Sequence, residues 1–158
     1  MTLDPRNLSF GGPAAIVSSM ALIVGLDAAT AAKATVVASL LIIGIGDNLT
    51  DSLSVHIYQE SEKLAERKAF RTTVGNFFTR LFVAFSFVVL FLLLPTSIAI
   101  YLCVAWGFVL LAGLSCLLAR VRGASVVSEI WKHSAVALVV IALSKAIGVW
   151  IPAMMSSS

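Results

Sequence analysis

Two aspartates four residues apart lie within an apolar stretch of the chain, in the sequence GDNLTDSLSVHIYQESE at positions 46–62. Residues with this spacing share one face of a helix, so Asp47 and Asp51 are expected to stack side by side. A charged side chain at the centre of a membrane helix costs about 3 kcal/mol even on the mildest insertion scale. Stacked carboxylates also repel each other unless a metal ion, a proton or a basic side chain intervenes. The pair therefore predicts either a cation site or a structural ion pair inside the membrane.

Side chains near the aspartates in sequence or in depth could complete a set of metal ligands. The predicted ligands of a divalent transition metal are Asp47, Asp51, Asn48, Thr50, Met20 and His56. Oxygen ligands suit hard divalent ions, whereas an imidazole or a thioether shifts the preference towards transition metals. Met20 is included because a count along its helix places it level with Asp47. Glu60 and Glu62 fall outside the hydrocarbon and are expected to attract ions at the inner mouth.

A lysine in the last apolar segment offers a counter-charge to the aspartates. Lys145 lies in VVIALSKAIGVW, about 17 Å from Ser134 at 1.5 Å per residue, and therefore near the middle of the membrane. It could form a fixed brace with Asp47, or it could leave Asp47 when a cation or a proton arrives. The sequence leaves both possibilities open.

The composition indicates which elements position these side chains. Of 158 residues, 59% are hydrophobic and 12% are charged, about half the charged fraction of a soluble domain. We predict an all-α, polytopic protein of one domain in the lipid bilayer, without a cleaved signal peptide. Five transmembrane helices are expected at residues 13–28, 34–58, 74–94, 97–119 and 131–151. Cys103 and Cys116 are about 20 Å apart on one of them, too far for a disulfide. Ala21 and Gly25 predict a small surface for close helix contact.

The basic residues predict that the N-terminus is cytosolic. Of the 11 lysines and arginines, all but Lys33 and Lys145 then fall on or near the cytosolic side, Arg80 among them. Because they cluster beside apolar spans, they indicate topology rather than a surface for nucleic acid. A multi-pass protein of a bacterial cytoplasmic membrane is expected.

Three stretches of the chain resemble the vacuolar iron transporter (VIT) family: SSMALIVGL, SVHIYQESE and SKAIGVWI. The resemblance covers most of the chain. It implies a homodimer that exports Fe²⁺ or Mn²⁺ from the cytosol in exchange for protons, with the ion path along the subunit interface. Asp51 falls where the family has a glutamate before a Ser-Val pair, and Asp47 falls near a family methionine. The chain departs from the family at Ala14, where the family has an aspartate, and in its much shorter glutamate-rich cytosolic segment.

A divalent-cation transporter without a permanently bound cofactor is the preferred prediction, and it involves no bond-breaking chemistry. The alternative is a non-transporting membrane scaffold in which Asp47 and Lys145 hold the bundle together. An intramembrane hydrolase is a third possibility. It would have to use His56 or His133, but both are expected at the cytosolic end, and neither belongs to a metalloprotease or nucleophile-elbow motif.

Overall fold

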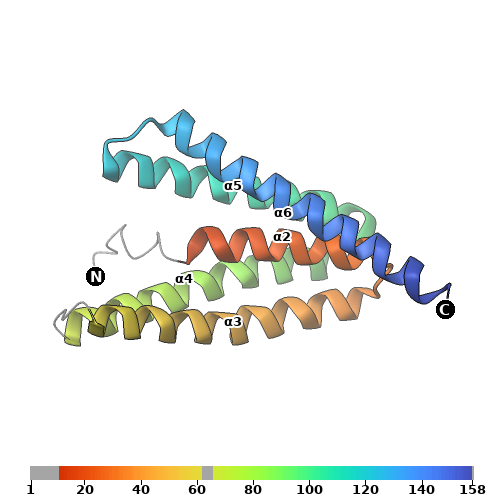
Figure 1. Cartoon of the computed structure of the whole chain (residues 1–158), viewed down its shortest axis with the longest axis horizontal. Helices are drawn as coiled ribbons and strands as arrows, with labels where there is room; N and C mark the ends of the chain where they lie inside the picture. Colours follow the sequence, from red (N-terminus) through yellow and green to blue (C-terminus); the bar gives the residue numbers. More distant parts are fainter. Residues whose placement is uncertain (1–10, 62–65, 158) are drawn as a thin grey trace.

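In the computed structural model, residues 11–61 and 66–157 are described, and these residues form helices and no strand. The helices are α2 (Gly12–Ala28), α3 (Lys33–Ser61), α4 (Glu66–Leu93), α5 (Thr96–Arg122) and α6 (Val126–Met155). They run along one axis in alternating directions, so that α3 and α4 form one antiparallel hairpin and α5 and α6 another (Figure 1). The prediction of an all-helical chain is confirmed for these residues. Each helix coincides with one predicted apolar segment, and the longer helices extend beyond it.

The outside of the bundle is apolar. Four of the described helices are long and apolar enough to cross a membrane: Lys33–Tyr58 of α3, Thr72–Leu93 of α4, Thr96–Arg122 and Val126–Met155. Large side chains such as Ile42 and Phe82 are 70% and 76% exposed, which suits lipid and not water. These features are those of an integral multi-pass membrane protein. The shorter α2 has 17 residues, which span about 26 Å against a hydrocarbon core of about 30 Å.

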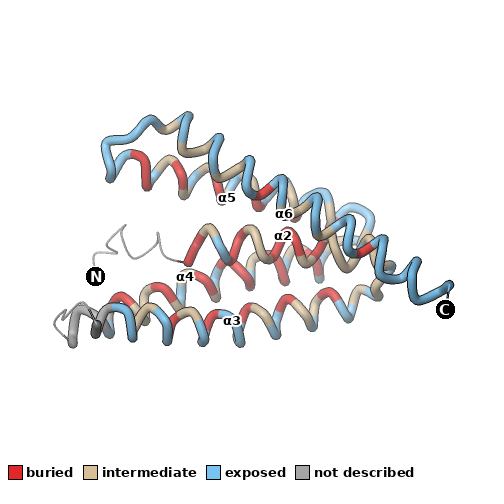
Figure 2. The backbone as a smooth tube through the Cα atoms, in the orientation of Figure 1, coloured by how far each residue is buried: buried red, intermediate tan, exposed pale blue. Residues whose placement is uncertain are grey.

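Helix α2 is the central element, because it contacts each of the other four helices. Figure 2 shows buried positions along most of its length. Its fully buried Ile16, Met20 and Ile23 pack in one apolar core with Phe87 of α4 and Leu111 of α5. The α3–α4 hairpin and the α5–α6 hairpin therefore pack around α2.

Small residues bring α2 and α6 together. A Cβ added at Gly148 would collide with the backbone carbonyl of Gly25, and one added at Gly25 would lie 3.2 Å from the carbonyl oxygen of Ser144. Close backbone approach through small residues is a common way for membrane helices to associate. The predicted contact surface around Gly25 is thus confirmed, with α6 as its partner.

The two hairpin turns at one end of the bundle are tied together by a lysine. Lys33, at the start of α3, donates through Nζ to the carbonyl oxygens of Leu92 at 3.0 Å and Leu94 at 2.8 Å. These carbonyls lie at the C-terminal end of α4, where the following Pro95 prevents the helix from continuing. A cation at this end also complements the helix dipole. The contact fixes the register of α3 against α4.

Candidate functional site

Both aspartates of the opening motif bind the same arginine. Arg80 of α4 donates through Nη2 to Asp47 Oδ2 at 2.7 Å and through Nη1 to Asp51 Oδ2. The prediction that the carboxylates share one face of α3 and need a positive charge between them is confirmed. That charge comes from Arg80, which the sequence analysis had counted among the cytosolic topology signals. The side chain of Arg80 is only 3% exposed inside the bundle, so Arg80 also has a role within the bundle that its count as a topology signal did not include.

Helix register explains why these three side chains meet. Asp47 lies 14 residues after Lys33, and Arg80 lies 14 residues before Leu94, so each is about 21 Å from the turn at which Lys33 contacts Leu94. In an antiparallel pair joined at that point, the two positions are level. The sequence did contain this signal, because Arg80 lies within the predicted span at 74–94 at the same depth as Asp47.

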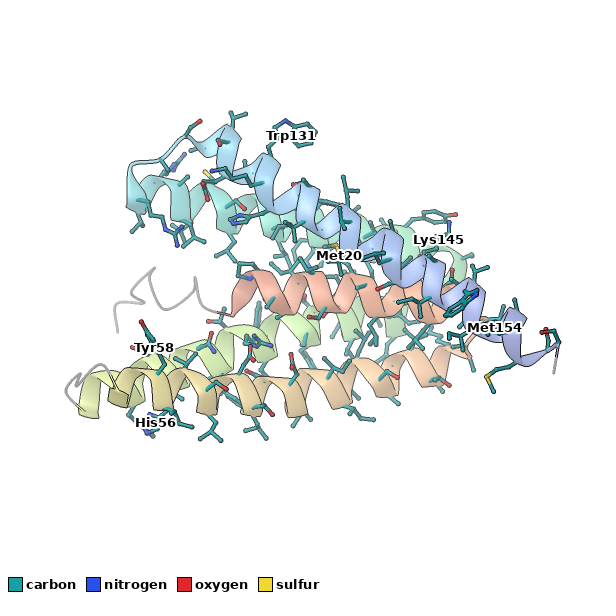
Figure 3. The ribbon with its side chains drawn as sticks, viewed as in Figure 1. Met20, His56, Tyr58, Trp131, Lys145 and Met154 are labelled. Carbon is teal, nitrogen blue, oxygen red and sulfur yellow. The ribbon has the colours of Figure 1, made fainter. Side chains whose placement is uncertain are left out.

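The structure does not give Lys145 the predicted role of counter-charge. Among the described residues, no ion pair joins Lys145 to Asp47, and Lys145 is exposed on α6 (Figure 3). Helix α6 packs mainly on α2 and α5, whereas α3 packs mainly on α4. Depth alone suggested the pairing of Lys145 with Asp47, but equal depth does not bring two helices into contact.

The group of Asp47, Asp51 and Arg80 has an unbalanced charge. Two ionised carboxylates and one guanidinium leave one negative charge, at a depth where an unpaired charge is costly. Arg80 uses only Oδ2 of each carboxylate, and no described residue donates to either Oδ1. Asp47 and Asp51 keep 48% and 43% of their side-chain surface exposed. The group can therefore still accept a cation or a proton on its open side.

A small recess adjoins this group between α2, α3 and α4. It is lined by Ala15, Ser18, Ser19, Ile43, Gly44, Asp47, Asn48, Arg80 and Ala84. The hydroxyls of Ser18 and Ser19 donate to carbonyl oxygens of their own helix, at 2.8 Å and 2.7 Å. The recess therefore presents oxygen atoms next to Asp47, and the amide of Asn48 borders it.

Polar side chains continue from Arg80 between α3 and α4. Asn48 donates through Nδ2 to the carbonyl oxygen of Phe77 at 2.8 Å. Further polar residues follow at steps of four along α3 and back along α4, so the antiparallel register stacks them in layers. We call this set the polar seam: Asn48, Ser52 and His56 of α3, with Arg80, Asn76 and Thr72 of α4. All but His56 are at most 6% exposed.

Several buried polar atoms of the seam have no hydrogen-bond partner among the described residues. They are Asn48 Oδ1, Ser52 Oγ, both polar atoms of the Asn76 side chain and Arg80 Nε. Leaving such an atom unsatisfied costs about 1–3 kcal/mol. For the whole set, the cost would reach the size of a domain's net stability of about 5–15 kcal/mol. Buried polar groups are normally hydrogen-bonded to protein or to ordered water, so these atoms are candidates for holding water.

The start of α2 closes over the seam. A Cβ added at Gly11 would collide with Cδ of Arg80 and Oδ1 of Asn76. The carbonyl oxygen of Gly11 also lies 3.5 Å from Arg80 Nη1, in a long hydrogen bond. Glycine at this position therefore permits the close approach that keeps Arg80 buried.

The remaining predicted ligands do not join the aspartates. Met20 points from α2 towards α5, where its sulfur occupies the space that a side chain at Gly107 would need (Figure 3). Thr50 donates to the carbonyl of Gly46 at 3.0 Å on the exposed face of α3. His56 lies near the C-terminal end of α3. The inclusion of Met20 in the ligand set was therefore wrong, because Met20 faces away from α3.

The side chains of the two acids predicted at the inner mouth lie outside the part of the chain that the structure describes. Glu62 lies outside the described residues, and the side chain of Glu60, within α3, does as well. Among the described side chains, no group of three or more His, Cys, Asp or Glu residues is placed to hold a metal ion. A cation at Asp47 and Asp51 would therefore have two carboxylates and neutral oxygens as its protein ligands.

The other histidine belongs to a separate polar group between α5 and α6. Ser115 Oγ is 2.7 Å from His133 Nδ1 and donates its proton to the carbonyl of Leu111 at 2.6 Å. Since the hydroxyl has one proton, His133 Nδ1 is the donor in the Ser115 contact. His133 Nε2 lies 4.0 Å from Glu129, beyond hydrogen-bond distance, and Glu129 accepts a hydrogen bond from Lys132 at 3.1 Å. In this arrangement the buried Ser115 is not activated as a nucleophile, and the group joins the two helices.

Comparison of the chain with known protein families, curated proteins and solved structures finds no match. The resemblance to the VIT family therefore remains a prediction.

Proposed function

We propose that this protein is a divalent-cation transporter that binds its ion at Asp47 and Asp51. The observation that carries the proposal is the unbalanced charge of the two aspartates with Arg80, together with the half-exposed carboxylates. A buried ion pair that only braces the fold gains most when its charges balance and its atoms are enclosed and hydrogen-bonded. A second carboxylate, accessible and deep in the span Lys33–Tyr58, supports a role in binding a mobile cation.

Arg80 acts in this proposal as the resident counter-ion. When no metal is bound, its guanidinium neutralises one of the two carboxylates. An arriving ion binds the free Oδ1 atoms and competes with Arg80 for the Oδ2 atoms. Because Arg80 remains charged at any physiological pH, it makes metal release easier and prevents the site from becoming a permanent trap. Protons compete for the same carboxylates, which allows metal export in exchange for protons without ATP.

The oxygen donors favour a hard ion. The nearby side chains offer carboxylates, the Asn48 amide and serine hydroxyls, while the thioether of Met20 faces α5. Carboxylate and carbonyl donors suit hard ions such as Mn²⁺, and they disfavour soft ions. We therefore propose Mn²⁺ as the better of the two substrates that the family resemblance implies.

We further propose five spans with a cytosolic N-terminus, in a bacterial cytoplasmic membrane, and a homodimer. Asp47, Thr50, Ser54 and Tyr58 are all exposed on one side of α3, within its apolar span. In a monomer this polar stripe would face lipid. A second copy of the chain packed against it would remove the stripe from lipid and enclose the two aspartates.

Uptake into proteoliposomes that contain a metal-sensing dye tests the transporter. We expect Mn²⁺ flux, weaker Fe²⁺ flux and little Zn²⁺ flux. The double variant Asp47→Asn, Asp51→Asn should abolish the Mn²⁺ flux. The variant Asp27→Asn, which changes an exposed acid outside the site, should preserve this flux. Equal Mn²⁺ flux in the double variant would exclude these aspartates as the site.

A membrane scaffold is the second candidate, favoured by the burial of Arg80 and its contacts with both carboxylates. Arg80 would then hold α3 against α4 through both carboxylates. The scaffold predicts no flux of any tested ion from protein that is folded and correctly inserted. It also predicts that the double variant, which leaves the buried Arg80 without a counter-charge, assembles less stably than the wild type.

A further inference from the structure

We propose that the polar seam between α3 and α4 is a water-filled path that leads from one end of the hairpin to Asp47 and Asp51. The proposal concerns bound water rather than transport, so a scaffold could contain the same path. Its ligand is a short chain of water molecules, held by the amide, hydroxyl and guanidinium groups of the seam.

The polar atoms that would hold this water are buried and unpartnered in successive layers. Asn48 and Asn76 are each 1% exposed, and Ser52 is 6% exposed. Asn48 Oδ1, Ser52 Oγ, both Asn76 polar atoms and Arg80 Nε have no partner among the described residues. A buried water normally makes two to four hydrogen bonds to such groups. The seam supplies both donors and acceptors, as a water chain requires.

The spacing of the layers fits water. Successive layers are about 5.4 Å apart, one helical turn. A single water bridges two polar atoms about 4.5 Å apart when each hydrogen bond is about 2.8 Å long and the two bonds meet at a near-tetrahedral angle, and two waters in series span more. One or two waters per layer would therefore connect Thr72 and His56, at one end of the seam, with Arg80 and its two carboxylates.

The seam narrows at its other end, beside the recess at Asp47. Beyond Arg80, the next layer brings Gly44 against Ala84, where a Cβ added to the glycine would lie 2.9 Å from that of Ala84. Gly11 covers the side of the seam at Arg80 and Asn76. We therefore place the entry of water at the end marked by His56 and Thr72, and the path ends at the recess beside Asp47, where Gly44 and Ala84 bring α3 and α4 together.

Silver ion tests the path, because Ag⁺ is similar in size to water, does not cross lipid and reacts with thiolates, which form only where water reaches the sulfur. The two native cysteines, which are free, are first replaced in the variant Cys103→Ala, Cys116→Ala. Single substitutions Ser52→Cys and Asn76→Cys then probe the seam in nanodiscs. After exposure to Ag⁺, the protein is denatured and the remaining thiol is counted with a fluorescent maleimide.

Two matched controls give the comparison. Leu53→Cys lies beside Ser52 on the apolar outer face, where Leu53 is 58% exposed. Val88→Cys lies on α4 in the apolar core, where Val88 is 2% exposed, and away from the recess at Asp47. We expect Ser52→Cys and Asn76→Cys to react at least about tenfold faster than both controls. Reaction at Ser52→Cys no faster than at Leu53→Cys would overturn the proposal, and so would equal reaction at Val88→Cys.

The conservative Ser52→Cys change keeps the test decisive if Asn76→Cys does not fold. Failure of this proposal is also distinct from failure of the transporter. A dry seam with intact Mn²⁺ flux would place the ion path elsewhere, while a wet seam without flux would leave the water path valid and the transporter wrong.

Discussion

Replacement of Arg80 by methionine should be the most damaging single change to the bundle. It removes a buried cation from two carboxylates, and loss of one partner of a buried pair costs about 3–5 kcal/mol. Because Asp47 and Asp51 are 48% and 43% exposed, water can solvate part of the orphaned charge. We therefore expect a loss at the low end of that range, about 3 kcal/mol. Lys145→Met, which removes an exposed cation, should change the free energy of unfolding by less than about 0.5 kcal/mol.

Unfolding in mixed detergent micelles, followed by fluorescence of the three tryptophans, measures these differences. A mutant cycle between Arg80 and the two aspartates isolates the free energy of their interaction. Adding Asp47→Asn and Asp51→Asn to Arg80→Met removes the orphaned charges and should recover about 2 kcal/mol of the loss. The reasoning is refuted if Arg80→Met is harmless, or if the triple variant is no more stable than Arg80→Met alone.

Three further changes test the contacts that position the site. Gly148→Leu should separate α6 from Gly25 of α2 and lower stability by at least about 2 kcal/mol, measured by the same unfolding assay. Gly11→Val should displace the Arg80 side chain and cost about 1–3 kcal/mol, with part of the cost relieved by Arg80→Ala, which clears the collision. Lys33→Met should remove the cap at the end of α4 and cost about 1 kcal/mol, with faster amide exchange confined to the last turn of α4.

Controls for these changes come from the same residue types. A Cβ added at Gly113 meets nothing within 4 Å, so Gly113→Val tests the effect of a larger side chain on an open helix face. It should change stability by less than either of the other two glycine variants. Equal losses at all three positions would mean that helix propensity, rather than close packing, sets the cost. For the lysine, exchange that increases along the whole of α4 would contradict a local cap.

The sequence was sufficient to predict the helices and the shared face of the aspartates. Both follow from local patterns: long apolar runs for the helices, and four-residue spacing for Asp47 and Asp51. The partner of the aspartates depended on which helices are neighbours, and hydropathy does not encode that. Depth made Lys145 a reasonable choice, but the register fixed by Lys33 brought Arg80 to the same level on the adjacent helix.

The polar seam could in part have been predicted. Asn48, Ser52 and His56 recur every four residues on α3, but hydroxyl and amide side chains in membrane helices are common enough that one stripe is a weak signal. The polar residues on α3 and those on α4 predict a shared polar layer only when the two helices are known to pack against each other. The prediction for Met20 failed for a related reason. Its depth in the membrane agreed with that of Asp47, but its side chain points to the space that Gly107 leaves on α5.

Direct binding of Mn²⁺ to the purified protein tests the central claim most simply. Free Mn²⁺ gives a six-line electron paramagnetic resonance signal that broadens beyond detection when the ion is bound by protein. We predict that wild-type protein and Asp27→Asn deplete this signal in a saturable manner, and that the double variant Asp47→Asn, Asp51→Asn does not. Equal depletion by the double variant, or none by the wild type, would contradict a cation site at these two aspartates.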